Sequence, residues 1–173
     1  RVIPWKEQIL KLAYTNYTEY SGNPLETEYH SFCRKNDSWL SDYSLFMACK
    51  DLHDGRSWLE WDQDFRRPTL ELRQELLTRL SAEIGYYQCV QSPVFKEWYA
   101  LKEYANHKNI EIIGDIPTFV SVDSAHDLVN QDLFQLDTDG DSDVVACVPP
   151  DYFSARGQLW GNQRDKCSVH TVN

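Results

Sequence analysis

Five features that would each identify a class of protein are missing from the sequence. No apolar run approaches the roughly 18 residues of a membrane-spanning helix, so we expect no transmembrane segment. There is no glycine-rich phosphate loop, no G-x-G-x-x-G sequence and no G-x-S-x-G elbow. The 5 histidines contain no H-x-x-x-H pair. These absences leave no support for phosphate or serine-nucleophile chemistry, and we expect neither a metal nor a cofactor.

Positive charge is scarce in the chain. It carries 17 Lys and Arg against 27 Asp and Glu, which gives a formal net charge of -10 at pH 7. Proteins that follow nucleic-acid phosphates or dock on anionic membranes present basic surfaces, so we expect neither a nucleic acid nor a membrane as partner. An acidic surface favours a neutral or cationic partner instead.

Cysteine is present but follows no pattern. The 5 cysteines are spread along the chain, their number is odd, and no pair has C-x-x-C spacing. That distribution predicts neither a disulfide framework nor a zinc site, and it favours a reducing compartment. Residues Arg1–Lys6 lack the apolar stretch of a secretory leader, so we expect a cytoplasmic protein.

Length and hydrophobic periodicity predict a mostly helical first part. At about 150 residues per domain, 173 residues correspond to one domain, although a complete (β/α)₈ barrel needs at least about 200. Apolar side chains at three- and four-residue steps predict helices within residues 1–108. We expect two helices at Trp5–Tyr17 and Thr69–Ile84, and a third that begins at Glu26. A fourth begins at Asn36–Ser38 and carries an apolar stripe of Trp39, Tyr43, Phe46 and Met47. A fifth begins at Ser92, with Pro93 in its first turn.

An apolar segment followed by an acid is the main feature early in residues 109–162, which are predicted to form strand, turn and loop. Ile110–Ile113 is short and β-branched, as buried strands are, and Asp115 follows closely. In barrels, functional groups lie at the carboxyl end of such strands. A carboxylate that only caps a loop would have the same sequence, so both interpretations of Asp115 remain open.

Two further elements are expected after this strand. Leu133–Leu136 and Val144–Val148 flank an acidic turn that contains the hairpin signal Asp139-Gly140, so we expect these two segments to pair. Asp123 and Ser124 precede a short helical stretch and are expected to form its N-cap.

Aromatic residues make up 13% of the chain, and three of them lie in one loop. Residues 149–162 combine Tyr152, Phe153 and Trp160 with prolines, amides and glycines. Exposed aromatic area is unfavourable, so such a loop persists where a ligand or another segment covers it. One interpretation is that sugars stack on the rings while carboxylate and amide groups bond the hydroxyls, and the other is packing on a neighbouring domain.

Several short motifs occur in a fixed order along about residues 28–162. They are Phe32-Cys33-x-x-Asn36-x-x-Trp39-Leu40-x-Asp42-Tyr43-x-Leu45-Phe46, Trp98-x-x-Leu101-Lys102-x-Tyr104-Ala105, Ile112-Ile113-Gly114-Asp115-Ile116-Pro117-Thr118-Phe119-Val120, Asp123-Ser124-Ala125, Pro149-Pro150-Asp151-Tyr152-Phe153-Ser154 and Gly157-Gln158-Leu159-Trp160-Gly161-Asn162. Each motif alone is weak, but their order is specific. Together they resemble the 4-α-glucanotransferases, also called amylomaltases or disproportionating enzymes, of glycoside hydrolase family 77.

The resemblance implies an α/β fold class, an incomplete (β/α)₈ TIM barrel with a helical insertion. Residues 1–108 would hold the insertion and a barrel helix, 109–162 a barrel strand and a substrate-covering loop, and 163–173 a disordered tail outside the family pattern. The implied partners are α-1,4-glucans such as maltodextrins, and the implied reaction is retaining transfer of a glycosyl group through a carboxylate. In a plant, the expected compartment would be the plastid.

The residues that perform this chemistry in the family are not found in the sequence. The resemblance places the nucleophile in an Arg-Ile-Asp-His-like motif on the next barrel strand, and the acid/base Glu and a His-Asp pair on later strands. None of these segments is present, so we expect the chain alone to be inactive. A non-catalytic glucan-binding or interaction module is the alternative interpretation.

The resemblance assigns site roles to six residues. Asp115 matches an active-site carboxylate that shapes the site without being the nucleophile. Tyr152 and Phe153 match the aromatic tip of a mobile loop that covers bound glucan and keeps water away from the glycosyl-enzyme. Asp151, Gln158 and Trp160 match that loop and its base.

The chain departs from the family pattern at several positions. Thr118 stands where the family has an apolar residue, Cys147 where it has Gly, and His126-Asp127-Leu128 where it has an Asp-Val-Trp-like run. Gly tolerates backbone angles that Cys does not, so Cys147 raises the question whether the loop has the hinge of the family.

Overall fold

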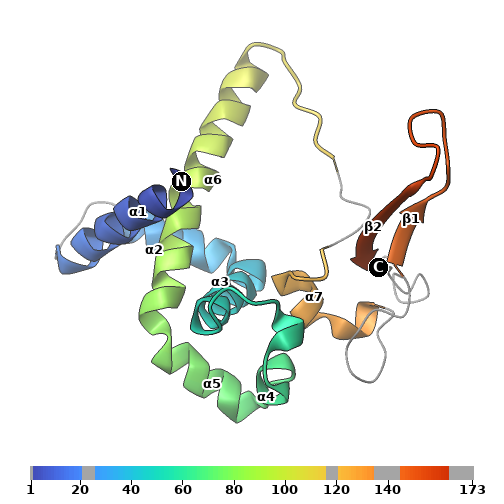
Figure 1. Ribbon diagram of the computed structural model, residues 1–173. Coiled ribbons are helices and arrows are strands. Elements are labelled where there is room, and N and C mark those ends of the chain that lie inside the picture. The colour runs from blue at the N-terminus through green and yellow to red at the C-terminus, as the bar shows by residue number, and fades with distance from the viewer. Residues whose placement is uncertain (1, 21–25, 116–120, 135–144, 164–173) are drawn as a thin grey trace. The chain divides into compact units, whose positions relative to one another are not determined.

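The computed structural model describes most of the chain (Figure 1). The described residues are 2–20, 26–115, 121–134 and 145–163. Thr118, the turn Asp139-Gly140 and the predicted tail beyond residue 163 lie outside them.

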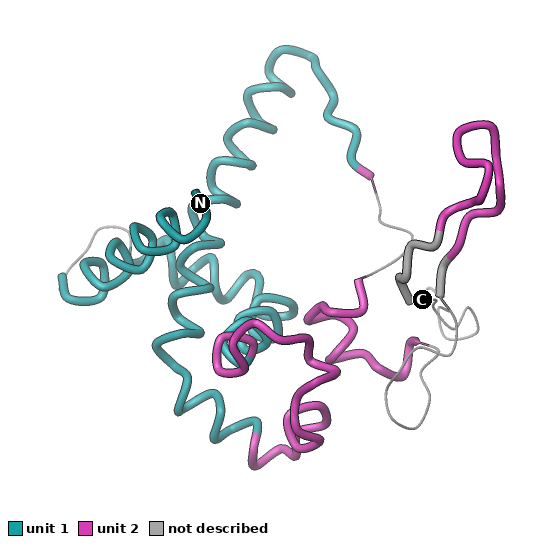
Figure 2. Tube along the Cα trace, in the orientation of Figure 1, with its two compact units in different colours: residues 1–49, 73–114 teal, residues 50–72, 115–173 magenta. Residues whose placement is uncertain are grey.

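The chain divides into two compact units (Figure 2). Unit 1 comprises residues 1–49 and 73–114, and unit 2 comprises residues 50–72 and 115–173. The family resemblance implies a different division, with boundaries at residues 108 and 162. That division follows family motifs and not compact units, so it stays a prediction.

Unit 1 is built from helices, as the periodicity predicts. Helices α1 (Val2–Glu19) and α2 (Glu26–Lys35) both pack against the long helix α6 (Ser81–His107), as Figure 1 shows. Most of α3 (Asp37–Leu52) and of α5 (Leu70–Arg79) completes the unit. Its core contains Leu40, Leu45, Phe46, Ala48, Cys49, Leu76, Leu80, Ile84, Tyr86 and Ala105. No helix among the described residues is both long and apolar enough to cross a membrane.

Helix α3 buries a different face from most of the predicted aromatic stripe. Leu40, Ser44 and Ala48, at four-residue steps, are buried. The Ser44 hydroxyl donates to the carbonyl of Leu40 at 2.7 Å, which satisfies this buried polar group. Trp39 of the predicted stripe is only half-buried, because it stacks on Phe95 of α6 at a centroid distance of 5.2 Å instead of entering the core.

Helix α6 continues through Pro93, so the separate helix predicted to start at Ser92 is wrong. Proline lacks the N–H that bonds the carbonyl four residues earlier, and its ring crowds that carbonyl. The helix continues because it is packed on both sides of Pro93: Tyr86 is buried before it, and Phe95 contacts Phe32 at a centroid distance of 5.5 Å after it. The helical pattern is interrupted at Leu80 instead, between α5 and α6.

The segment Ile110–Ile113 is extended and exposed, so the predicted buried strand is wrong. Residues 110–115 belong to neither a helix nor a strand, and Ile113 is 92% exposed. A strand is stabilised by hydrogen bonds to a neighbouring strand, and the sheet in the described part of the chain joins only β1 and β2. The chain enters the segment through Asn109, which has a left-handed φ of 56°.

Unit 2 contains short elements, and Trp58, Trp61 and Phe134 are its buried apolar side chains among the described residues. The elements are η1 (Trp58–Glu60), α4 (Gln63–Arg66), α7 (Ala125–Val129), η2 (Gln131–Leu133), β1 (Val145–Val148) and β2 (Gln158–Gln163). The amide of Gln131 donates to the carbonyl of Arg66 at 2.7 Å, which joins the early and late segments of this unit.

The C-terminal hairpin pairs β1 with β2. The predicted pairing of Leu133–Leu136 with Val144–Val148 falls largely on residues 135–144, which lie outside the described residues, so it stays a prediction. The strands run antiparallel, with Cys147 opposite Leu159 and Val148 opposite Gln158 (Figure 1). Strand β2 contains a glycine and three amide side chains, which have low strand propensity, so its sequence does not identify it as a strand. Its pairing makes the aromatic segment the loop of the hairpin.

Candidate functional site

Two aromatic side chains in the loop of the β1–β2 hairpin are almost fully exposed. Tyr152 is 96% exposed and Phe153 is 90% exposed. Their rings meet edge-to-face at a centroid distance of 5.5 Å and an interplanar angle of 90°. Contact between water and apolar rings of this size is unfavourable. Covering the rings with a ligand or another segment therefore lowers the free energy. The pair presents two perpendicular ring faces to whatever covers the loop.

A tight turn at Asp151 shapes the backbone that carries the two rings. One carboxylate oxygen, Oδ1, accepts the N–H of Phe153 at 2.9 Å and that of Ser154 at 2.7 Å. The N–H of Asp151 donates to the carbonyl of Ser154 at 3.0 Å. Such local side-chain bonds are the usual reason for Asp in turns. Asp151 thus fixes the backbone that carries the rings, a structural role that the sequence analysis did not assign to it.

The loop closes at Gly157. The hydroxyl of Ser154 donates to its carbonyl at 2.7 Å, and its N–H donates to the carbonyl of Ser154 at 3.1 Å. The φ of Gly157 is 71°, in the left-handed region, and a Cβ there would lie 2.4 Å from the carbonyl oxygen of Val148. Glycine meets both constraints, because it has no Cβ.

The predicted base of the loop lies on the two strands. Gln158 and Trp160 belong to β2, and Gln158 pairs with Val148. Cys147, which stands at a family glycine position, pairs with Leu159 in β1 and does not have a positive φ. Cysteine adopts strand angles without strain, so this substitution leaves the backbone of the hinge intact.

Asp115 makes no described contact with the hairpin loop. It follows the extended segment 110–114, and its side chain is exposed. Within the described residues, no hydrogen bond, ion pair or ring contact joins it to the loop of residues 149–157. The structure therefore brings Asp151, Tyr152, Phe153 and the strand residues together in one hairpin and does not bring Asp115 to them.

A buried set of contacts in unit 2 fixes the residues just before α7. The indole N–H of Trp58, which is fully buried, donates to the carbonyl of Val122 at 2.6 Å. Lys50 forms an ion pair with Asp123 through Oδ2. These contacts join residues more than sixty positions apart, so sequence reasoning missed them, although Lys50, Trp58 and Asp123 were each visible as single residues.

Asp127 in α7 is a buried carboxylate beside Trp58. Its side chain is 0% exposed, and its N–H donates to the hydroxyl of Ser124, which caps the helix as predicted. Burial raises the pKa of Asp127 to about 7, and a hydrogen bond from Trp58 acts in the opposite direction. The signal available in the sequence was an acid at a position where the family pattern is apolar.

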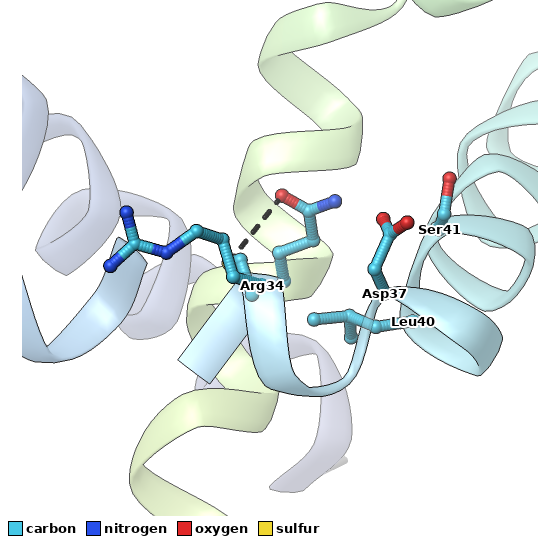
Figure 3. A pocket seen from close by; sticks show the side chains of 6 residues that line it. Arg34, Asp37, Leu40 and Ser41 are labelled. Carbon is cyan, nitrogen blue, oxygen red and sulfur yellow. Dashed lines mark hydrogen bonds between the residues drawn. The ribbon is translucent and has the colours of Figure 1, made fainter. Parts of the chain in front are cut away.

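An open pocket in unit 1 contains none of the predicted site residues. Its volume is about 380 Å³. Figure 3 shows Arg34 and Asp37 directed to opposite sides, with no ion pair between them. The thiol of Cys33 donates to the side-chain oxygen of Gln88 at 3.9 Å. The lining residues are Cys33, Arg34, Asp37, Leu40, Ser41 and Gln88.

Relatives of known identity match almost the whole chain. The family model Glyco_hydro_77, described as 4-alpha-glucanotransferase, matches residues 1–166. The 4-alpha-glucanotransferase of Synechocystis sp. is 41% identical over 163 residues, which are 94% of this chain and 32% of that protein. The 4-alpha-glucanotransferase of Thermus thermophilus is 40% identical over 159 residues, which are 91% of this chain and 32% of that protein.

A solved structure shares the fold. The amylomaltase from Streptococcus agalactiae, in complex with acarbose, superposes with a TM-score of 0.87 at 34% identity, covering 96% of this chain and 33% of that one. The chain thus spans about a third of the length of these relatives. The family match starts at residue 1 and reaches residue 166, so it extends beyond the motifs on both sides. Because the match covers nearly every residue and the fold agrees with it, the chain belongs to the 4-alpha-glucanotransferase family.

Proposed function

We propose that this chain is part of a 4-α-glucanotransferase that moves α-1,4-glucan segments between maltodextrins by retaining double displacement. The observation that carries the proposal is the exposed pair Tyr152 and Phe153, carried by the loop of the β1–β2 hairpin in a chain of this family. In a retaining reaction, a glycosyl group is held on a carboxylate before an acceptor takes it. Excluding water at that stage favours transfer over hydrolysis, and an apolar loop over the bound glucan supplies this exclusion.

The geometry of the loop suits a glucan as its ligand. Glucose rings have apolar faces, which pack on aromatic rings, and hydroxyl groups around the edge. The rings of Tyr152 and Phe153 supply the apolar contact. Since Oδ1 of Asp151 is used by the turn, we assign its second oxygen to a sugar hydroxyl. The resemblance adds Gln158 and Trp160, which belong to β2, as further contacts of the glucan.

Asp115 is assigned to the same site on the basis of the family resemblance. The resemblance places its carboxylate at the carboxyl end of a barrel strand, where functional groups of barrels lie, and the carboxylate is exposed in this chain. In this proposal the chain contributes one part of an incomplete (β/α)₈ barrel, and the nucleophile and the acid/base belong to segments outside it. The chain alone therefore has no transferase activity. Location in the cytoplasm, or in a plastid, also stays a prediction.

The experiment is a chimera in which residues 1–163 replace the matched segment of the Synechocystis relative. We expect it to disproportionate maltotriose, whereas the isolated chain does not. Replacing both Tyr152 and Phe153 by Ala should raise the share of glucose released by hydrolysis several-fold. Tyr20→Ala removes a tyrosine that is also exposed, but lies outside the loop, and should change neither product. A folded chimera without activity on maltotriose would refute the proposal.

The second candidate is a non-catalytic glucan-binding module, and the exposed aromatic loop is again the observation that favours it. It requires saturable binding of maltoheptaose by the isolated chain, measured by calorimetry. Binding that is lost in Tyr152→Ala and Phe153→Ala, combined with an inactive chimera, would select this candidate over the transferase.

A further inference from the structure

Two free thiols of unit 1, Cys33 on α2 and Cys89 on α6, have no role in the proposed glycosyl transfer. Both side chains are half-buried. Helix α6 packs against both α1 and α2, so the three helices form one junction within this compact unit (Figure 1). Disulfides in reducing compartments are usually transient and redox-sensing. Two free thiols that the fold brings close together are therefore candidates for such a bond.

The thiol of Cys33 contacts the turn of α6 that carries Cys89. Its S–H donates to Oε1 of Gln88, the residue just before Cys89, at 3.9 Å. The hydroxyl of Tyr29, one turn earlier on α2, donates to the same oxygen at 3.2 Å. Because α2 and α6 pack against each other, these contacts belong to the interface between the two helices. Cys33 and Cys89 thus come from neighbouring turns of two packed helices.

Helix α1 completes the junction and lies close to both thiols. A Cβ at Gly85, one turn before Cys89, would lie 2.2 Å from the hydroxyl oxygen of Tyr14, so α1 approaches α6 closely here. Tyr17 follows Tyr14 by one turn on α1. Burial raises the pKa of Tyr17, and the nearby thiols of Cys89 and Cys33 raise it further. Two sulfur atoms from different helices therefore lie near one hydroxyl group.

Cys33 is accessible to a small reagent. It lines the open pocket of about 380 Å³ in unit 1, which is wide enough for a peroxide. Burial raises the pKa of the Cys33 thiol, and a hydrogen bond from Tyr29 acts in the opposite direction. Since the thiolate is the form that reacts, oxidation is slow at neutral pH and becomes faster as the pH rises.

We propose that Cys33 and Cys89 form a peroxide-responsive dithiol, which closes to a disulfide that clamps α2 to α6. First, the thiolate of Cys33 attacks one oxygen of hydrogen peroxide, the O–O bond breaks, and the leaving hydroxide takes up the thiol proton to become water. The sulfur of Cys33 is then a sulfenic acid. Next, the thiolate of Cys89 attacks this sulfur, the S–O bond breaks, and a second water leaves. The two thiols lose two electrons, which the peroxide gains. This inference does not depend on the proposed transferase reaction.

The test is peptide mapping of the 173-residue chain after treatment with excess hydrogen peroxide at pH 8, in the monomer fraction and with the remaining thiols blocked. Trypsin releases Cys33 in peptide 12–34 and Cys89 in peptide 80–96, and neither peptide contains another cysteine. We expect these two peptides to be joined in nearly all of the disulfide that contains Cys33, and dithiothreitol to separate them. In a chain unfolded by urea before oxidation, Cys33 should pair with several different cysteines, because the helix junction is lost.

Variants separate the two steps. Cys89→Ser should stop at the sulfenic acid of Cys33, which dimedone labels, whereas the wild type should label weakly. The matched control is Cys147→Ser, which removes an exposed thiol of the hairpin and should leave the joined peptides unchanged. The oxidised chain should melt several degrees above the reduced chain, because the cross-link restricts the unfolded state. Circular dichroism checks that the variants fold, and mapping of the wild type decides alone if Cys89→Ser does not.

Three results would overturn the proposal. In the first, peptides 12–34 and 80–96 are not joined after oxidation of the folded wild type. In the second, the folded chain distributes Cys33 over the same partners as the chain unfolded in urea. In the third, the oxidised chain melts no higher than the reduced chain, so that the bond does not clamp the helices.

Discussion

The buried carboxyl of Asp127 leads to a quantitative prediction about pH. Its pKa of about 7 in the folded chain, against an ordinary value of 3.8, is a difference of about 3 units, or about 4 kcal/mol at 1.36 kcal/mol per unit. The folded state binds the proton more tightly than the unfolded state, so this stabilisation is complete below about pH 4 and is lost as the pH rises to about 7. Between pH 5 and pH 8, the group should lower the free energy of unfolding by about 2–3 kcal/mol.

Asp127→Asn removes the titration and keeps the shape of the side chain. Urea unfolding at pH 5 and at pH 8, monitored by tryptophan fluorescence, gives the free energy of unfolding of both proteins. Between these pH values, the decrease in the free energy of unfolding should be about 2–3 kcal/mol smaller in the variant than in the wild type. Comparing the two proteins cancels the contributions of the histidines. Asp132→Asn, at an exposed acid in η2, is the control and should behave like the wild type. Equal losses in the wild type and in Asp127→Asn would refute the reasoning.

Three other substitutions test the backbone and the packing. Gly157→Ala should disturb the loop by about 1–3 kcal/mol, because the new methyl group meets the Val148 carbonyl at a left-handed φ, and it should shift the amide signals of the loop in NMR spectra. Pro93→Ala should raise the midpoint of thermal unfolding, since proline inside a helix costs about 3 kcal/mol. Trp58→Phe leaves the Val122 carbonyl without its indole donor and should lower the free energy of unfolding by about 1–3 kcal/mol in urea.

Helix periodicity was enough to locate most of unit 1. The helices α1, α2 and α3 follow from apolar residues at three- and four-residue steps, and the cap at Ser124 follows from its hydroxyl. Within the aromatic stripe predicted for α3, Phe46 is buried as expected, but Trp39 is only half-buried. Periodicity identifies a face of a helix but not which neighbour covers it. Pro93 was misread for a related reason: its local cost is real, but packing at Tyr86 and Phe95 on either side outweighs it.

The strands were predicted less well because a strand depends on its partner. Ile110–Ile113 has the composition of a buried strand, but no strand in the described part of the chain lies beside it. β2 has an unfavourable composition and still pairs, since the loop from Pro149 to Gly157 returns it to β1. In both cases the deciding contact lies in another segment, which propensity does not contain.

The candidate site depends both on local sequence and on contacts between distant segments. The hairpin loop is encoded locally: Ser154 bonds both Asp151 and Gly157 within seven residues, and the loop composition together with the family motifs located Tyr152 and Phe153. The other side of the site is not local. The residues Val122 and Asp123, which follow Asp115 in the chain, are bound by Trp58 and Lys50, more than sixty positions earlier. No sequence motif spans that distance. It follows that the loop can retain its shape in this chain. In the proposed site, the position of Asp115 depends on strand neighbours for Ile110–Ile113, and the described part of the chain supplies none.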